Sequence, residues 1–258
     1  MVKMIMKKCM VVTGVIDVDN SFGFTYSPVR SSFTNEERLK QTVATIDQLH
    51  NLCDENTKIY LLVCANQPEK YLEDFSPYKN VVYVDFIKQF PEEYKIVTTH
   101  PHKSYGEMTL QTTFFDNYKQ ELKDYDYFFK LSGRYIIEDY FDLELCNTEN
   151  LNKFLFKKPT EFNWDNNWNY HLVDRRNFQG NNKLNQYCTI FYGWGREKHP
   201  VILNIFKSIA DVTNNKKTMQ YDVELLLYFF TRWYQDEIVD LPTVVFGWLG
   251  TDAQFVRY

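Results

Sequence analysis

Several features that would define a class of function are missing from this 258-residue sequence. No stretch approaches the roughly 20 consecutive apolar residues that a membrane-spanning helix needs. Neither G-x-G-x-x-G after the first predicted strand nor G-x-x-x-x-G-K-[ST] occurs, which disfavours a dinucleotide-dependent enzyme and a P-loop enzyme. The net charge is −5 and the pI about 5.6. This balance argues against a general nucleic-acid binder but leaves room for a small anion in a local basic pocket.

Disulfide and secretion signals are also scarce. The five cysteines are an odd number with no C-x-x-C pair, which is typical of a reducing compartment. There is no N-x-[ST] sequon. The N-terminal segment has lysines before an apolar run of only about eight residues and lacks a small-x-small cleavage pattern, so it predicts a first strand rather than a signal peptide. We expect a soluble, cytoplasmic protein without a transmembrane segment.

The first 86 residues predict alternating strands and helices. Apolar runs predict strands over 9–16, 58–65 and 81–86, and helical spacing of apolar residues predicts helices over 34–53 and 69–75. Thr34 with Glu37 three residues later forms a capping box at the start of the first helix. This β-α-β-α-β order is typical of the nucleotide-binding half of a doubly wound sheet.

The remaining chain continues this pattern less regularly. We predict a loop over 86–102, a helix over 103–122, a strand over 125–131 and a short irregular element over 135–145. Strands over 151–156 and 186–192, helices over 201–212 and 219–234, and a strand-like stretch over 238–249 follow. The tail from 250 to 258 is expected to fold back over the site. The sequence therefore predicts an α/β fold, with a mixed, mainly parallel sheet flanked by helices in a single domain.

The stretch D-Y-D-Y-F-F-K-L-S-G-R-Y over 124–135 is the centre of the functional prediction. Its aromatic, apolar run predicts a buried strand that Ser132 and Gly133 terminate. In an open α/β sheet, ligands bind in the crevice beyond the carboxyl ends of the strands. Arg134 would project into that crevice with a planar fork suited to phosphate. A structural salt bridge is the alternative role for this arginine.

This stretch resembles the nucleotide-sugar glycosyltransferases of GT-A fold, in particular the small soluble enzymes of bacterial surface-glycan clusters and large DNA viruses. In that family Y-D-Y-hydrophobic-hydrophobic-x-L leads into an Asp-x-Asp that holds a divalent metal on the sugar nucleotide. Ser132 and Arg134 stand at those two positions here. The guanidinium would then do the metal's electrostatic work. Mn²⁺ or Mg²⁺ is therefore not required by the sequence, and the candidate ligands are Asp126, Asp165 and His199.

The resemblance divides the chain into a donor half, about 1–135, and an acceptor half, about 136–258. It implies that the donor half binds the nucleoside-diphosphate sugar through Thr13, Gly14, Arg30, Lys103, Ser132, Gly133 and Arg134. Arg38 is a further phosphate or ribose candidate, or else a solvated or salt-bridged helix residue. The segment over 160–185 is expected to be an acceptor-side loop or lid, or else a locally packed loop. G-W-G-R-E over 193–197 resembles the galactosyltransferase branch, and a strand-to-helix turn is the alternative. The implied acceptor contacts are Trp164, Trp168, Trp194 and Glu197.

Asp222 and Glu224 lie in the first turn of a predicted helix, where inverting enzymes of this family place their general base. Carboxylates also favour helix N-termini because of the helix dipole alone, and a retaining enzyme would need no such base. The resulting prediction is a hexosyl- or pentosyltransferase that moves a sugar to a hydroxyl of a glycan or glycoprotein acceptor, with Arg134 and one carboxylate as catalytic groups. The alternative is a non-catalytic carbohydrate-binding or assembly protein on a degenerate transferase fold.

Overall fold

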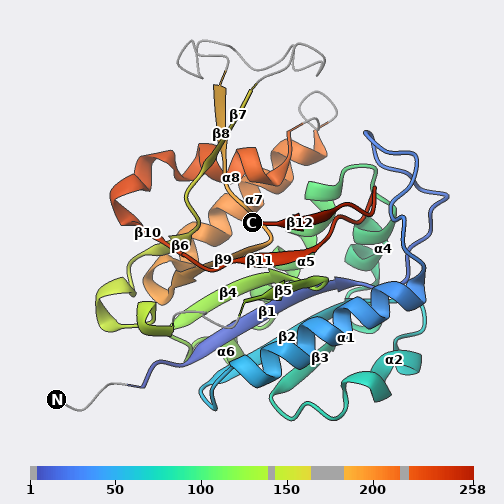
Figure 1. Ribbon diagram of the computed structural model, residues 1–258, viewed down its shortest axis with the longest axis horizontal. Coiled ribbons are helices and arrows are strands. Elements are labelled where there is room, and N and C mark those ends of the chain that lie inside the picture. Colours follow the sequence, from blue (N-terminus) through green and yellow to red (C-terminus); the bar gives the residue numbers. More distant parts are fainter. Residues whose placement is uncertain (1–4, 139–142, 164–182, 216–220) are drawn as a thin grey trace.

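The computed structural model describes residues 5–138, 143–163, 183–215 and 221–258. They form an α/β fold around a seven-stranded mixed sheet, with the strand order β10-β6-β9-β4-β1-β2-β3 (Figure 1). Strand β9 runs antiparallel to both of its neighbours, whereas the other pairs in this sheet are parallel. The predicted mixed, mainly parallel sheet flanked by helices is confirmed. Its strands are β1 (Lys8–Val15), β2 (Thr57–Cys64), β3 (Val81–Asp85), β4 (Tyr127–Ser132), β6 (Phe154–Phe156), β9 (Phe191–Gly195) and β10 (Ile238–Asp240).

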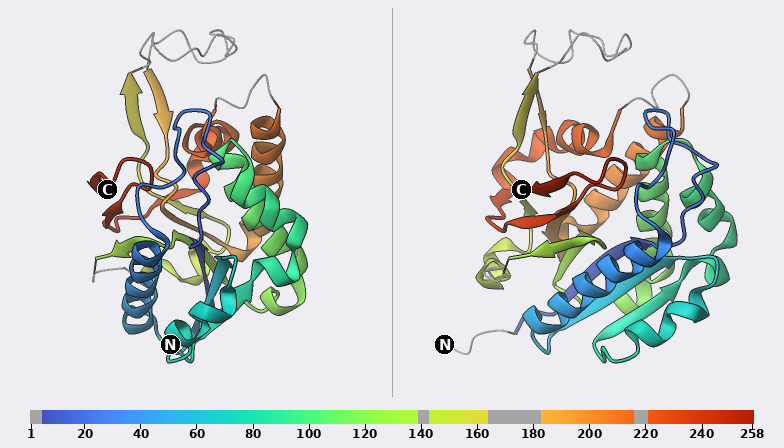
Figure 2. Two further views of the ribbon diagram at one scale, coloured as in Figure 1. Left: turned by 90° about the vertical axis from the view of Figure 1, so that its right-hand side faces the viewer. Right: turned by 45° about the vertical axis from the view of Figure 1, so that its right-hand side comes forward.

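Helices cover both faces of the sheet (Figure 2). Helices α1 and α2 pack on one face, and the α3–α8 helices pack on the other. This arrangement follows from the strands, which are apolar on both sides, as in sheets that are buried on both faces. The helices are α1 (Asn35–Leu52), α2 (Pro68–Phe75), α3 (Phe86–Gln89), α4 (Pro91–Thr99), α5 (Lys103–Asn117), α6 (Lys119–Leu122), α7 (His199–Asn214) and α8 (Val223–Thr231).

Two hydrophobic clusters, one on each face, hold the layers together. Val11 and Phe128 face the cluster with α5 and α7, and the next residues along the same strands, Val12 and Phe129, face the cluster with α1. This alternation is the period-2 geometry of a strand. All four side chains are almost fully buried, and each such burial stabilises the fold by roughly 1.5–3 kcal/mol.

Smaller elements complete the fold. A three-stranded sheet with the order β12-β11-β5 lies beside the main sheet, and its middle strand pairs with β5 in antiparallel fashion. A separate antiparallel pair, β7 and β8, projects from the body (Figure 1). These strands are β5 (Tyr135–Ile137), β7 (Thr160–Asn163), β8 (Lys183–Gln186), β11 (Val245–Trp248) and β12 (Phe255–Arg257). The 3₁₀ turns are η1 (Leu143–Leu145), η2 (Thr148–Asn150), η4 (Arg196–Lys198) and η5 (Arg232–Glu237).

The predicted start of the first helix is confirmed in detail. Thr34 is the N-cap of α1, and its hydroxyl accepts a hydrogen bond from the Glu37 amide at 3.2 Å. The Glu37 carboxylate in turn accepts one from the Thr34 amide at 2.8 Å. This reciprocal box satisfies two of the amides that a helix leaves unpaired at its start.

The segment over 86–102 is not the predicted loop, because most of it forms α3 and α4. The side chain of Asp85 caps α3 by accepting from the Lys88 amide at 3.1 Å. Pro91 opens α4, followed by two glutamates in its first turn. Proline at the first helical position and acidic residues after it are a helix-start signal, and the loop prediction missed it.

The strand predicted over 186–192 is also shifted, because β9 begins at Phe191 and includes Gly193, Trp194 and Gly195. A side chain at Gly193 would run into the ring of Phe129, and one at Gly195 into the carbonyl of Leu151. These glycines therefore allow close packing within and beside the sheet and do not mark a turn. Among the helices that the structure describes, none is both long and apolar enough to cross a membrane.

Candidate active site

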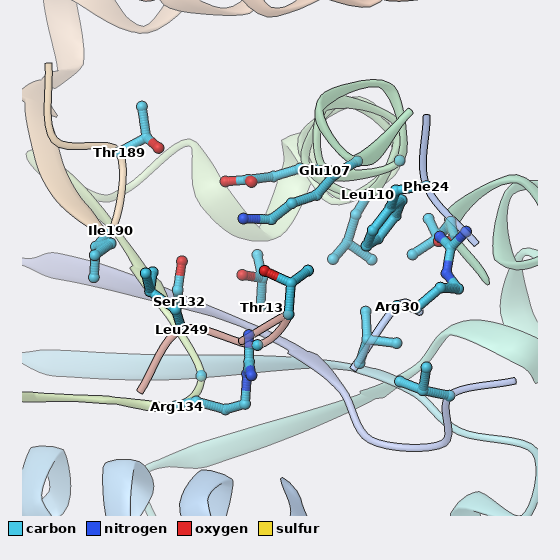
Figure 3. A pocket seen from close by; sticks show the side chains of 18 of the residues that line it. Thr13, Phe24, Arg30, Glu107, Leu110, Ser132, Arg134, Thr189, Ile190 and Leu249 are labelled. Carbon is cyan, nitrogen blue, oxygen red and sulfur yellow. The ribbon is translucent and has the colours of Figure 1, made fainter. Parts of the chain in front are cut away.

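A pocket opens where β1 and β4 end (Figure 3). After β1 the chain moves outward through β2 and β3, whereas β4 lies on the other side of β1. The carboxyl ends of β1 and β4 therefore form the topological switch point of the sheet, the place where open α/β sheets bind ligands. Counted out to its open mouth, with the open space above it included, the pocket has a volume of about 1070 Å³.

Gly133 allows the turn after β4 to cross closely over β1. Its amide donates to the Thr13 carbonyl at 2.8 Å, and a β-carbon at this position would lie only 2.8 Å from the same carbonyl oxygen. Only glycine permits this approach. The turn then directs Arg134 into the pocket, beside Gly250 of the segment after β11.

Arg134 carries a positive charge that no carboxylate balances among the described residues. Its side chain is half-buried, and the Nη1 atom is enclosed without a hydrogen-bond partner. Burial lowers the pKa of its guanidinium, but an arginine stays protonated in proteins. Leaving a buried charged donor unpaired is costly, so the structure around Arg134 is suited to receiving an anion. The predicted alternative, a salt bridge of Arg134, is absent from the described part of the chain.

Two other arginines of the pocket are bound to backbone carbonyls. Arg30 donates to the carbonyls of Val97 and His100, at 3.0 and 2.9 Å, in the last turn of α4. Arg38 donates to the Val15 carbonyl at 2.8 Å, where β1 ends. Burial and the like charges of Arg134 and Arg30 hold the pKa of the Arg38 guanidinium well below its ordinary value. Both side chains have structural partners, and both add to the positive potential of the pocket.

Helix α5 contributes Lys103, Gly106, Glu107 and Leu110 to the wall above Arg134. Lys103 is exposed to the solvent-filled space of the pocket. Glu107 forms an ion pair with Lys130, which lies on β4 and is fully buried. Lys130 Nζ also donates to the Ser132 hydroxyl at 2.9 Å and to the Thr189 carbonyl at 2.7 Å. These contacts hold the Glu107 carboxylate in place at the edge of the pocket.

The two predicted base candidates have different positions. Glu224 lines the pocket, and its Oε1 atom accepts a hydrogen bond from the Thr189 hydroxyl at 2.6 Å. Asp222 is the N-cap of α8 and accepts from the Leu225 amide at 3.2 Å. Burial, together with the negative charge of Glu224, raises the pKa of the Asp222 carboxyl to about 7. Glu224 is therefore the carboxylate placed to meet a substrate, and Asp222 caps its helix.

The end of the pocket opposite Thr189 is mainly apolar. Val15, Val97, Leu110 and Phe24 line it, and the Phe24 ring stacks on Tyr26 with ring centroids 5.4 Å apart. The Arg30 guanidinium lies 4.2 Å from the centre of the Phe24 ring. The Phe24 ring therefore already has an aromatic partner and a cation packed against it.

The pocket brings together eight of the predicted site residues: Thr13, Arg30, Arg38, Lys103, Ser132, Gly133, Arg134 and Glu224. Gly14 follows Thr13 and Asp222 lies two residues before Glu224, but neither Gly14 nor Asp222 lines the pocket. Trp164, Trp168 and Asp165 lie outside the described residues. The predicted fold-back of the tail is supported, because Gly250 and Thr251 line the pocket.

Four predicted residues lie near the start of β4, at the end of the strands away from the pocket: Asp126, Trp194, Glu197 and His199. Strand β9 is antiparallel to β4, so Gly195 pairs with Tyr127 at the start of β4, away from the pocket. Trp194 is fully buried, and its indole N–H donates to Nδ1 of His199 at 3.1 Å. The assignment of Trp194 as an acceptor contact is therefore corrected, because its side chain is part of the core.

Glu197 follows β9 at this same distant edge and is exposed. Asp126 forms an ion pair with Arg196 at 2.9 Å and accepts from the Lys7 amide at the same distance. It directly precedes β4, at the end of the strand away from the pocket, so it is not placed to act as the predicted metal ligand there. Glu197 therefore has no place in the pocket, and Asp126 and His199 do not approach it.

The donor set of the pocket does not fit a divalent metal. Within the described ranges, no three His, Cys, Asp or Glu side chains lie close enough to hold a metal ion. Of the two carboxylates in the pocket, Glu107 is paired with Lys130 and Glu224 with the Thr189 hydroxyl. Lys103 and Arg134 would in addition repel a cation. The groups that face the centre of the pocket suit an anion better than a metal.

Sequence reasoning missed several residues of the pocket, notably Phe24, Glu107, Thr189 and Gly250. Phe24 and Gly250 lie in irregular segments that carry no periodic signal. Glu107 was included in the predicted helix, and its i, i+4 spacing from Lys103 already placed both on one helix face. That spacing is the one signal that could have identified it.

No protein-family model matches this sequence, and no curated protein matches it. Among the solved structures that are similar to it are two at 12% sequence identity. The crystal structure of the glycosyltransferase GlyE in Streptococcus pneumoniae TIGR4 has a TM-score of 0.48 over 92% of this chain. The apo form of GlyE has a TM-score of 0.44 over 91%. The chain spans about 45% of the length of each, and similarity at this level is too weak to assign an activity.

Proposed function

We propose that this protein is a glycosyltransferase that uses a nucleoside-diphosphate sugar and a hydroxyl of a glycan or glycoprotein. The observation that carries the proposal is Arg134, a half-buried guanidinium with an enclosed, unpartnered Nη1 at the switch point of a doubly wound sheet. The planar fork of arginine can bind a phosphate group through two parallel hydrogen bonds. The resemblance of the sequence around β4 to GT-A enzymes favours a sugar nucleotide among the phosphate ligands, with the cytoplasm as the proposed compartment.

Arg134 and Lys103 would hold the diphosphate between them. In the transfer, the bond between the anomeric carbon and the diphosphate oxygen breaks, and the diphosphate leaves with the electron pair. The two cationic side chains would stabilise the negative charge that develops on it. In this proposal they take the role that a divalent metal has in the Asp-x-Asp enzymes, in agreement with Ser132 and Arg134 at those positions.

Glu224 is the proposed general base. It would take the proton from the acceptor hydroxyl as the hydroxyl oxygen forms its bond to the anomeric carbon, on the side opposite the leaving diphosphate. Its carboxylate is oriented by the Thr189 hydroxyl, which leaves Oε2 for the acceptor. This assignment makes the enzyme inverting, with the donor in the half before about residue 135 and the acceptor approaching from the later half.

The direct test is release of the nucleoside diphosphate from a panel of nucleotide sugars, without acceptor and in the presence of EDTA. Many transferases hydrolyse their donor slowly, and a protein that only binds carbohydrate does not. Slow release from one donor supports the proposal. No release from any donor, with intact binding of glycans, would favour the non-catalytic binding protein instead.

The base assignment is tested separately with Glu224→Gln and Asp222→Asn. With an acceptor present, the Glu224 variant should lose at least about 100-fold in kcat, within the usual range for a general base. The Asp222 variant keeps an N-cap side chain and should retain most of its activity. Full activity of the Glu224 variant would remove the base assignment and point to a retaining reaction.

A further inference from the structure

The pocket has three parts that follow one another along its length (Figure 3). Phe24 and Leu110 mark an apolar end, Arg134 lies in the middle, and Ser132, Ile190 and Thr189 form the other end. If the diphosphate of the proposed donor binds at Arg134, a donor in an extended conformation places its nucleoside and its sugar on opposite sides of it. The apolar end suits the nucleobase, which is the least polar part of such a donor. The sugar is then directed to the end that contains Thr189, Ser132 and Glu107.

Glu107 is held rigidly at this end of the pocket. Lys130 binds its Oε1 atom, and Lys130 itself is fully buried and fixed by two further hydrogen bonds, to the Ser132 hydroxyl and the Thr189 carbonyl. No described residue donates a hydrogen bond to the second carboxylate oxygen, Oε2. The side chain is 13% exposed, and Figure 3 shows its carboxylate directed into the pocket.

The charge of Glu107 is maintained by its surroundings. Burial raises the pKa of its carboxyl, but the positive charges of Lys130 and Lys103 outweigh burial, so the pKa lies below its ordinary value. An ionised carboxylate accepts hydrogen bonds and donates none. In a substrate it can accept hydrogen bonds from hydroxyl groups, and it repels a second carboxylate.

We infer that Glu107 accepts hydrogen bonds from hydroxyl groups of the donor sugar and thereby selects an uncharged sugar over a uronic acid. This inference rests on the proposed function. Lys130 acts as a positioning residue, since it contacts Glu107 and does not line the pocket. Glu224 lies at the same end and adds a second negative charge against a uronate.

The Glu107→Gln variant reverses the polarity of this contact without changing its size. The ammonium group of Lys130 attracts the amide oxygen, so the NH₂ group is left facing the sugar and cannot accept from a hydroxyl. Glu121→Gln is the matched control, because Glu121 is exposed on α6 and outside the pocket. Removing the partner of buried Lys130 could unfold the protein, so Glu107→Gln with Lys130→Met, which removes both charges, is the second variant.

The experiment measures the dissociation constants of free nucleoside diphosphates and of their glucose esters by calorimetry. The uridine, guanosine, adenosine and thymidine compounds are compared on the wild-type protein, and the nucleotide that binds best is used for the variants. Glu107→Gln and the double variant should bind the free diphosphate within twofold of wild type. Both should bind the glucose ester at least about tenfold more weakly, because hydrogen bonds to charged groups contribute about 1.5–3 kcal/mol.

The glucuronate ester of the same nucleotide completes the test. Wild type should bind it at least about tenfold more weakly than the glucose ester, and Glu107→Gln should reduce that difference. An unchanged affinity of the variants for the glucose ester would overturn the role of Glu107, and so would equal losses for the ester and the free diphosphate. If no nucleoside diphosphate binds to wild type, the proposed function itself fails, and that result is obtained before any variant is made.

Discussion

Replacing Arg134 should have opposite effects on stability and on ligand binding. Its guanidinium has one enclosed, unpartnered nitrogen and no carboxylate partner within the described ranges. Arg134→Met keeps most of the side-chain volume and removes the charge. Relieving an unsatisfied buried group is worth roughly 1–3 kcal/mol. Because the side chain is only half-buried, we expect the lower end, a gain of about 1 kcal/mol in the unfolding free energy of the ligand-free protein.

The same change removes the main contact to the diphosphate. Charge-assisted hydrogen bonds contribute about 1.5–3 kcal/mol, so the affinity for the nucleoside diphosphate should fall about 10- to 150-fold. Urea unfolding of the ligand-free protein measures the first effect, and calorimetric titration with the nucleoside diphosphate measures the second. Arg196→Met is the control, because Arg196 is exposed and lies at the opposite edge of the sheet.

A variant that is less stable than wild type, yet binds the diphosphate equally well, would refute this reasoning. Such a protein would show that Arg134 is a structural residue whose charge is compensated in solution. A loss of both stability and binding would also count against it, since the unpaired charge of Arg134 is expected to destabilise the ligand-free wild-type protein.

Three further predictions follow from the same geometry. Gly250→Ala should displace the Arg134 guanidinium, because the new β-carbon would lie 2.8 Å from both Nη atoms. The affinity for the diphosphate should then fall about tenfold in titrations. Gly14→Ala, whose new β-carbon has no neighbour closer than 3.5 Å, should leave that affinity unchanged. The pKa of Asp222 is raised to about 7 in the folded protein, against an ordinary value of about 3.9. The protonated carboxyl therefore stabilises the fold below pH 4, and this contribution to the unfolding free energy is lost as the pH rises to 7. Asp222→Asn should therefore be more stable than wild type at pH 8 but not at pH 4. The expected gain is roughly 1.4 kcal/mol for each pH unit that separates the folded from the unfolded pKa. An equal difference in unfolding free energy between variant and wild type at both pH values, measured by urea unfolding, would disprove it. Trp194→Phe should cost about 1–3 kcal/mol in unfolding free energy by leaving Nδ1 of the half-buried His199 without its donor, while the KM for the acceptor stays the same. A raised KM with normal stability would restore the acceptor role.

The regular part of the fold could be predicted because its signals are local. The apolar runs of β1, β2 and β4 and the capping box at Thr34 are contained within a few residues. Ser132 and Gly133 end β4, and the general rule for open α/β sheets then places Arg134 at the ligand crevice. These features need no knowledge of distant contacts.

The direction of β9 could not be read from the sequence. Gly193, Trp194 and Gly195 were predicted either to belong to a substrate-binding stretch or to form a turn, but they lie inside a strand whose antiparallel pairing with β4 carries them to the end of the sheet away from the pocket. Strand direction depends on tertiary pairing, and nothing in five residues encodes it. The Lys130–Glu107 pair was missed for the same reason, since a lysine within an aromatic run is recognised as buried and paired only when α5 is placed against β4.

The pocket is proposed to recognise a diphosphate through its cationic side chains, and a calorimetric titration series measures this recognition. Wild-type protein is titrated in EDTA with the nucleoside, the monophosphate and the diphosphate of each common nucleotide. We predict that one diphosphate binds at least about tenfold more tightly than its monophosphate and that added salt weakens it. Equal affinities for mono- and diphosphate, or binding that appears only with a divalent metal, would contradict the claim.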